Sequence, residues 1–182
     1  LSRIVAERGK DAALARLIKR ASLLYLLGIF YYGGFSAIEG HGGTFADLRL
    51  LGVLQRIALC YLFAGWLFIF LRTRGLLAAL AVLLGGYWAL MTFVPVPGIG
   101  AGHFDEGKNL ANWVDSQFLP GRKWDGDHDP EGLLSTLPAI GTCLLGVLAG
   151  IFLREGKSSP TAKSGLLAVD RKSTRLNSSH IT

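Results

Sequence analysis

Four stretches of the chain are almost entirely apolar, and polar loops separate them. They run over about residues 17–35, 48–71, 75–94 and 133–153. Each is close to the roughly 20 residues that an α-helix needs to cross a bilayer. These runs are too hydrophobic for the surface of a water-soluble protein. We therefore predict an all-α fold, a multi-pass transmembrane helical bundle with about four membrane helices.

The second apolar run contains two polar residues, Gln55 and Arg56, about two turns from its start. Lipid cannot solvate a charge at that depth, so we expect both side chains to face other helices or a cavity. Small and polar residues recur every four positions on the same face: Gly52, Arg56, Cys60 and Ala64. Arg56 either binds a polar group within the bundle, pairs structurally or reaches the outer interface, with Asp129 and Glu131 as candidate partners.

Composition and loop charges predict an integral membrane protein with a defined orientation. The chain is 51% hydrophobic, with a mean hydropathy of +0.40. Three basic segments fall on one side of a four-helix arrangement: the lead-in at 1–16, the turn Arg72–Arg74 and the linker at 155–169. By the positive-inside rule we place them in the cytoplasm, with the acidic 95–132 loop outside. A bacterial inner membrane suits this pattern.

Both ends of the sequence favour an internal fragment. The chain opens at Leu1 in mid-sequence, and no signal-peptide pattern follows. Residues 170–182 include the string DRKSTRLNSSH, which resembles the translation of a sequencing adapter, so we expect the natural chain to stop near Val169. Removing Asp170, Arg171, Lys172 and Arg175 lowers the formal net charge from +6 to +4. The basic tail is thus no sign of a nucleic-acid partner.

The 95–132 loop is too long for a bare connection, and it contains an amphipathic segment. One helical face is apolar: Leu110, Trp113, Val114 and Phe118. The other positions are polar: Asn109, Asn112, Asp115 and Ser116. We predict a short helix that lies on the membrane surface or covers the bundle.

We predict no metal site from the sequence. Asp125, Asp127 and Asp129 have the spacing that opens a calcium loop. That loop needs glycine next and glutamate at its twelfth position, and Pro130 and Thr136 stand there instead. The loop histidines show no ligand spacing: His41, His103 and His128.

Two strings resemble a known family. They are GVLQRIAL at 52–59 and DPEGLLSTLPAI at 129–140, continued by LGVLAG at 145–150. The strings are similar to the heparan-α-glucosaminide N-acetyltransferase family and its bacterial relatives, and the resemblance covers most of 16–154. It implies a multi-pass enzyme that takes an acetyl group from cytoplasmic acetyl-CoA and delivers it to an amino-sugar or other small amine acceptor across the bilayer.

The resemblance also implies where the site lies. The catalytic histidine is expected before the first helix, so we assign no catalytic residue within this sequence. The candidate cavity or substrate-binding residues are Gln55, Arg56, Asp129, Glu131 and Ser135. The candidate CoA-phosphate contacts are Arg16, Arg20 and Arg72, although positive-inside topology alone would also place them there. The alternative is a transporter-like or non-catalytic bundle. A homo-oligomer is compatible with the sequence.

Overall fold

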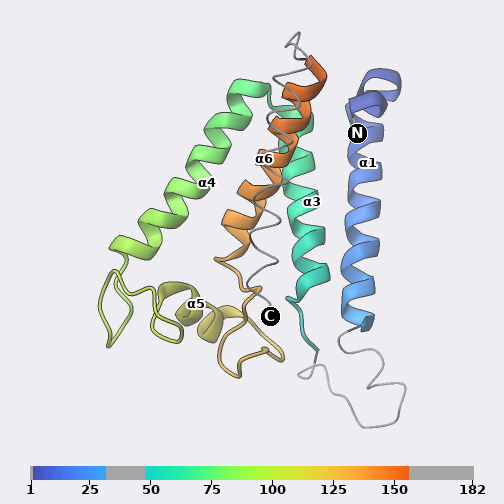
Figure 1. The fold of residues 1–182 in the computed structure, drawn as a ribbon. Helices are drawn as coiled ribbons and strands as arrows, with labels where there is room; N and C mark the ends of the chain where they lie inside the picture. Colours follow the sequence, from blue (N-terminus) through green and yellow to red (C-terminus); the bar gives the residue numbers. More distant parts are fainter. Residues whose placement is uncertain (1, 32–47, 156–182) are drawn as a thin grey trace, which may run out of the picture. The chain divides into compact units, whose positions relative to one another are not determined.

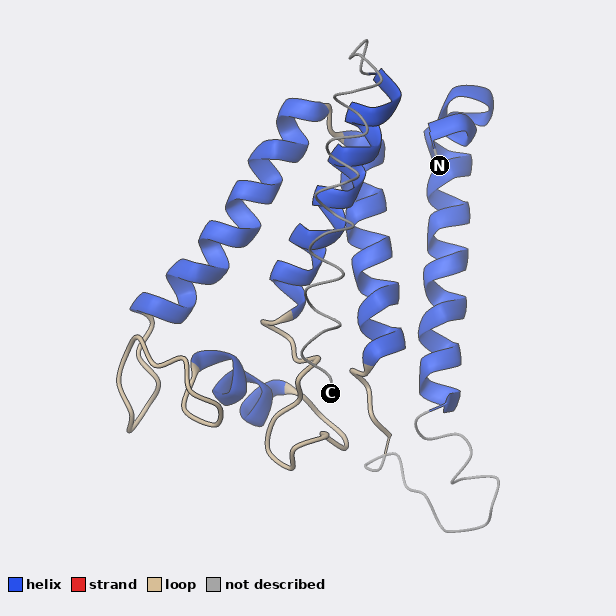
Figure 2. Cartoon of the chain, in the orientation of Figure 1, coloured by secondary structure: helices blue, strands red, loops and turns tan. Residues whose placement is uncertain are grey.

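The computed structural model describes residues 2–31 and 48–155, and all regular structure within these ranges is helical. Within these ranges five helices follow one another (Figure 1; Figure 2). Their bounds are α1 Ser2–Ile29, α3 Val53–Phe70, α4 Thr73–Phe93, α5 Leu110–Phe118 and α6 Thr136–Glu155. The chain divides into two compact units, Leu1–Val147 and Leu148–Thr182, and the interactions described below lie within the first.

Helices α1 and α3 form the most closely packed pair, and they run antiparallel (Figure 1). Ala13 and Leu17 of α1 pack on Ile69 near the end of α3. At the other end of the pair, Gly28 lies against Gln55. The close approach depends on small residues, since a methyl group at Gly65 would lie 2.5 Å from a Leu17 carbon.

Among the described residues, three helices are long and apolar enough to cross a membrane: Val53–Phe70, Thr73–Phe93 and Thr136–Arg154 within α6. The described residues thus agree with an all-helical fold, and the three helices are consistent with an integral membrane protein. The expected first crossing at 17–35 is not among the three. Within α1 the charges of Arg16, Lys19 and Arg20 interrupt the apolar pattern, and residues 32–35 lie outside the described ranges. The fourth crossing therefore stays a prediction.

The first of these spans begins later than the apolar pattern predicts. We expected a helix from residue 48, but α3 starts at Val53, with Gly52 as its N-cap in an extended conformation. Residues Leu48–Gly52, named the entry segment below, are not helical. An isolated antiparallel bridge pairs Arg49 with Gly121 in the 95–132 loop. Tertiary hydrogen bonds thus override the helix propensity of the leucines at this point.

The predicted short helix in the 95–132 loop is confirmed as α5, and its packing fixes the loop near α4. Asn109 caps it by accepting a hydrogen bond from the Asn112 N–H at 2.9 Å. Leu110 forms a small core with Met91 of α4 and Val96. Phe118, at the end of the expected apolar face, is 66% exposed.

Candidate functional site

The entry segment is held by polar contacts from three directions. The Tyr25 hydroxyl of α1 donates to the Leu50 carbonyl at 3.0 Å, and the Gln55 amide donates to the Arg49 carbonyl at 3.1 Å. From the 95–132 loop, the Arg122 N–H donates to the Leu48 carbonyl. A side chain at Gly121 would collide with that same carbonyl. The backbone around Arg49 is therefore firmly positioned.

Arg49 is the centre of a buried charged cluster. Its Nε and Nη2 donate to the two carboxylate oxygens of Asp129 at 2.8 and 2.6 Å, a bidentate pair. Nη2 also donates to Glu131 Oε2 at 2.6 Å. The Arg49 side chain is 7% exposed, that of Asp129 0% and that of Glu131 19%. The guanidinium lies 5.1 Å from the centre of the Trp124 ring, within cation–π range. We name Arg49, Asp129 and Glu131 the charged cluster.

The surroundings of Asp129 keep it ionised. Burial by itself would raise the pKa of this carboxyl, but hydrogen bonds from Arg49 and from two backbone N–H groups outweigh the burial. Those N–H groups belong to Trp124 and Glu131. The net result is a pKa below the ordinary value of an aspartate.

Arg56 lies close to the charged cluster but binds other groups. It is the fourth residue of α3, so it lies near the end of the span and not about two turns in, because the entry segment is not helical. Its guanidinium donates to the backbone carbonyls of Pro130 at 3.1 Å and Ser135 at 2.8 Å. Asp129 and Glu131, which we expected as partners of Arg56, pair with Arg49 instead. Arg56 thus connects the start of α3 to the segment that precedes α6.

Gln55 faces α1 with an unsatisfied acceptor. Its side chain is fully buried, and within the described ranges Gln55 Oε1 has no hydrogen-bond partner. A Cβ at Gly28 would lie 2.6 Å from that oxygen. Its amide holds the entry segment, as described above, so the predicted inward orientation agrees with the structure.

Asp115 has a structural role that the sequence did not predict, because the helical pattern placed it on the polar face of α5. The residue is 2% exposed. Its Oδ1 accepts a hydrogen bond from the Leu133 N–H at 2.8 Å, and a side chain at Gly132 would overlap its carboxylate. Burial raises its pKa, although the Leu133 hydrogen bond acts in the opposite direction. Asp115 thus connects α5 to the segment that leads into α6.

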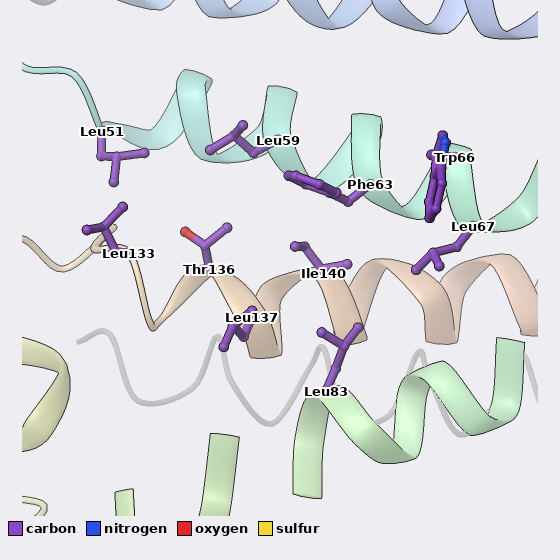
Figure 3. A pocket seen from close by; sticks show the side chains of 10 residues that line it. All are labelled: Leu51, Leu59, Phe63, Trp66, Leu67, Leu83, Leu133, Thr136, Leu137 and Ile140. Atoms are coloured by element: carbon purple, nitrogen blue, oxygen red, sulfur yellow. The ribbon is translucent and has the colours of Figure 1, made fainter. Parts of the chain in front are cut away.

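An apolar cavity of about 340 Å³ lies between α3, α4 and α6 (Figure 3). Leu59 and Phe63 come from α3, Leu83 from α4 and Ile140 from α6. Leu51 and Leu133 line one end, and Trp66 and Leu67 line the other (Figure 3).

Two residues that line one end of this cavity are close in sequence to charged residues. Leu51 follows Arg49 by two residues, and Leu133 follows Glu131 by two. Thr136, also in the lining, donates its hydroxyl hydrogen to the Gly132 carbonyl at 2.8 Å. Ser135 is half-buried, and its hydroxyl donates to the carbonyls of Pro130 and Gly132. The cavity lining is therefore apolar along its length, and charged residues are close in sequence to Leu51 and Leu133 at one end.

The three candidate CoA-phosphate contacts are exposed and lie away from the charged cluster. Arg16 adjoins Leu17, which packs on Ile69, so Arg16 lies toward the end of α3 where Arg72 precedes α4. Arg20 is one turn further along α1. These residues form no common cluster in the described ranges. His41 lies outside those ranges, and His103 is exposed.

The structure thus joins four of the five candidate residues, Arg56, Asp129, Glu131 and Ser135, in one region, with Gln55 behind it. Sequence patterns missed Arg49 and Asp115. The only signal for Arg49 was a charge three residues before a glycine at the start of an apolar run. No protein-family model matches this sequence, and no curated protein matches it either. The family resemblance therefore depends on the strings at 52–59, 129–140 and 145–150 and on the similar loop at 96–121, with NLA at 109–111 and FLPG at 118–121.

Proposed function

We propose that this chain is part of a membrane acyltransferase that moves an acetyl group from cytoplasmic acetyl-CoA to an extracytoplasmic amine, an amino sugar being the acceptor class. The observation that supports this proposal is the apolar cavity whose end at Leu51 and Leu133 is two residues from Arg49 and Glu131 in sequence. Acyl transfer needs a thioester held away from water, an acceptor held by polar groups and donors for a developing oxyanion.

The cavity suits the donor arm. Its volume falls within the roughly 300–1,000 Å³ that is usual for small-molecule sites. An apolar lining excludes water, and hydrogen bonds and charges near such a lining act more strongly than in bulk solvent. In the proposed orientation, acetyl-CoA enters from the side of Arg72, and the acetyl group reaches the end of the cavity at Leu51 and Leu133.

The charged cluster suits the acceptor. Glu131 is the most accessible of its three members, so it is the residue proposed to accept hydrogen bonds from an amino sugar. Arg49 and Asp129 hold Glu131 in position. Arg56 and Ser135 border the same region, and the Arg56 guanidinium is the proposed donor to an oxyanion. The resemblance implies that a histidine base comes from a preceding segment.

The test uses the full-length gene product that contains this sequence, in detergent, with acetyl-CoA labelled in the acetyl group and glucosamine as acceptor. Leu83→Trp fills the cavity and is expected to weaken acetyl-CoA binding and transfer at least tenfold. Val82→Trp, one residue away and 71% exposed, adds the same ring outside the cavity and serves as the matched control.

The proposal is wrong if the protein neither becomes acetylated nor transfers label, and if Leu83→Trp and Arg56→Ala leave acetyl-CoA binding unchanged. Equal losses in Leu83→Trp and Val82→Trp would count against the cavity as the donor site.

A second candidate is a non-catalytic or transporter-like bundle in which Arg56 is structural. The two hydrogen bonds from Arg56 to backbone carbonyls favour this alternative, because they use the guanidinium to join α3 to α6. Under it, Arg56→Ala destabilises the fold, and acetyl-CoA does not bind to the full-length protein at all.

A further inference from the structure

Three potential metal ligands meet in the outer loop, apart from the charged cluster. His128 Nε2 lies 3.5 Å from Glu106 Oε1 and 3.9 Å from Asp125 Oδ2. All three ligand atoms lie within 4.8 Å of one another. Glu106 comes from the connection between α4 and α5, whereas Asp125 and His128 come from the connection between α5 and α6. The group therefore joins two loops that are separate in sequence.

His128 is prepared to bind a ligand through Nε2. The residue is 8% exposed, and Nε2 is buried without a hydrogen-bond partner among the described residues. The other ring nitrogen, Nδ1, lies 2.6 Å from Asp127 Oδ1. An ionised carboxylate only accepts hydrogen bonds, so Nδ1 carries the hydrogen and the Nε2 lone pair faces the two acids. This carboxylate–histidine arrangement is the usual support for a metal-binding imidazole.

Charge also favours a bound cation. Glu106, Asp125 and Asp127 place three carboxylates around one imidazole. The group is thus a centre of negative charge that attracts a divalent ion.

We propose that Glu106, Asp125 and His128 bind a divalent transition-metal ion of the Zn²⁺ type, with Asp127 orienting the histidine. Zinc bonds of about 2.0–2.2 Å at tetrahedral angles place ligand atoms roughly 3.3–3.6 Å apart. The distance from His128 to Glu106 is in this range, and the one to Asp125 needs a contraction of a few tenths of an ångström. The Glu106 side chain is 81% exposed, so it can adjust, and solvent supplies the fourth ligand.

Metal binding here would fix the loop beside the charged cluster, because His128 is followed directly by Asp129. Metal binding at these residues does not require acyl transfer, since none of them belongs to the proposed donor site. In the sequence, Asp125, Asp127 and Asp129 have the spacing that starts a calcium loop. In the structure these three carboxylates have different partners: the His128 Nε2 region, His128 Nδ1 and Arg49.

The test measures Zn²⁺ binding to the purified full chain, carrying an affinity tag without histidine, by competition with a chromogenic chelator. We expect one site per chain, and Co²⁺ substitution should give the visible absorption of a four-coordinate ion. His128→Ala and Glu106→Gln should each weaken binding more than tenfold. Asp127→Asn should weaken it about 10- to 100-fold, the usual effect of losing such a support.

Matched controls come from the same loop. His103→Ala removes an exposed histidine, and Asp105→Asn removes a charge next to Glu106, so both should bind Zn²⁺ as the unmodified chain does. Because Glu106 and Asp127 are largely exposed, their variants should fold normally. The proposal is overturned if no Zn²⁺ binds, leaving His128 only an ion-paired residue, or if the controls lose as much affinity as the ligand variants.

Discussion

The strongest structural prediction concerns Arg49→Met, which removes the guanidinium and keeps a side chain of similar length. The change leaves Asp129, whose side chain is fully buried, without its bidentate partner. Breaking a buried ion pair by removing one partner costs about 3–5 kcal/mol. Two backbone N–H groups still donate to Asp129, so we expect the lower end of this range, about 3 kcal/mol.

A double-variant cycle separates the pair from its surroundings. Asp129→Asn removes the buried negative charge and keeps an acceptor oxygen for one of the two backbone N–H groups. The double variant should therefore be more stable than Arg49→Met alone, with a coupling energy of about 1–3 kcal/mol. Arg122→Met is the control, since Arg122 is exposed in the same loop, and its effect should stay within about 0.5 kcal/mol.

The assay is equilibrium unfolding in mixed micelles with increasing SDS, followed by tryptophan fluorescence and by helix circular dichroism. A loss of less than about 1 kcal/mol in Arg49→Met, well below the expected value, would refute the stabilising role of the buried pair. Losses of Arg49→Met and Asp129→Asn that simply add would refute it equally, because the two side chains would then not act on each other.

Three further predictions follow from the same region. Gly132→Ala forces a methyl group onto the Asp115 carboxylate and should lower the free energy of unfolding by about 1–3 kcal/mol. Gly146→Ala places its methyl group in open space and is the control that should not destabilise the fold. Equal losses of stability in the two variants would contradict the packing of Gly132 on Asp115. Asn109→Ala removes the N-cap of α5, so it should lower the free energy of unfolding by about 1 kcal/mol and speed amide hydrogen exchange in Leu110–Phe118. Gln117→Ala, at an exposed position of the same helix, is the control that should leave the exchange unchanged. Because the folded-state pKa of Asp129 is lowered, its contribution to stability is complete above the ordinary aspartate pKa and is lost as the pH falls through the lowered value. Asp129→Asn should remove this part of the acid dependence, and an unchanged acid limb in the variant would show that Asp129 is not responsible.

Hydropathy predicted the three spans within one to three residues at most ends, because a bilayer leaves an apolar helix few alternatives. The amphipathic pattern likewise located α5. The start of α3 was placed five residues too early, since the leucines around Arg49 favour a helix. Only long-range hydrogen bonds, from Tyr25 and from the 95–132 loop, show that this segment is not helical.

The sequence predicted most residues of the candidate site but not which of them pair with one another. A single sequence indicates that Asp129 and Glu131 precede an apolar run, but it does not say which arginine they meet. Arg56 looked buried because the helix seemed to begin earlier, and Arg49 looked like the first turn of that helix. Asp115 was assigned to the polar side of α5, since its partner, the Leu133 N–H, lies 18 residues away.

The most direct test of the proposed acetyl transfer is its direction across a membrane. The full-length protein is placed in inside-out vesicles, with labelled acetyl-CoA outside and glucosamine sealed within. We predict labelled N-acetylglucosamine in the lumen, at a rate that Leu83→Trp lowers and Val82→Trp does not. Label that never appears in the lumen, while acetyl-CoA stays intact outside, would contradict transfer across the bilayer.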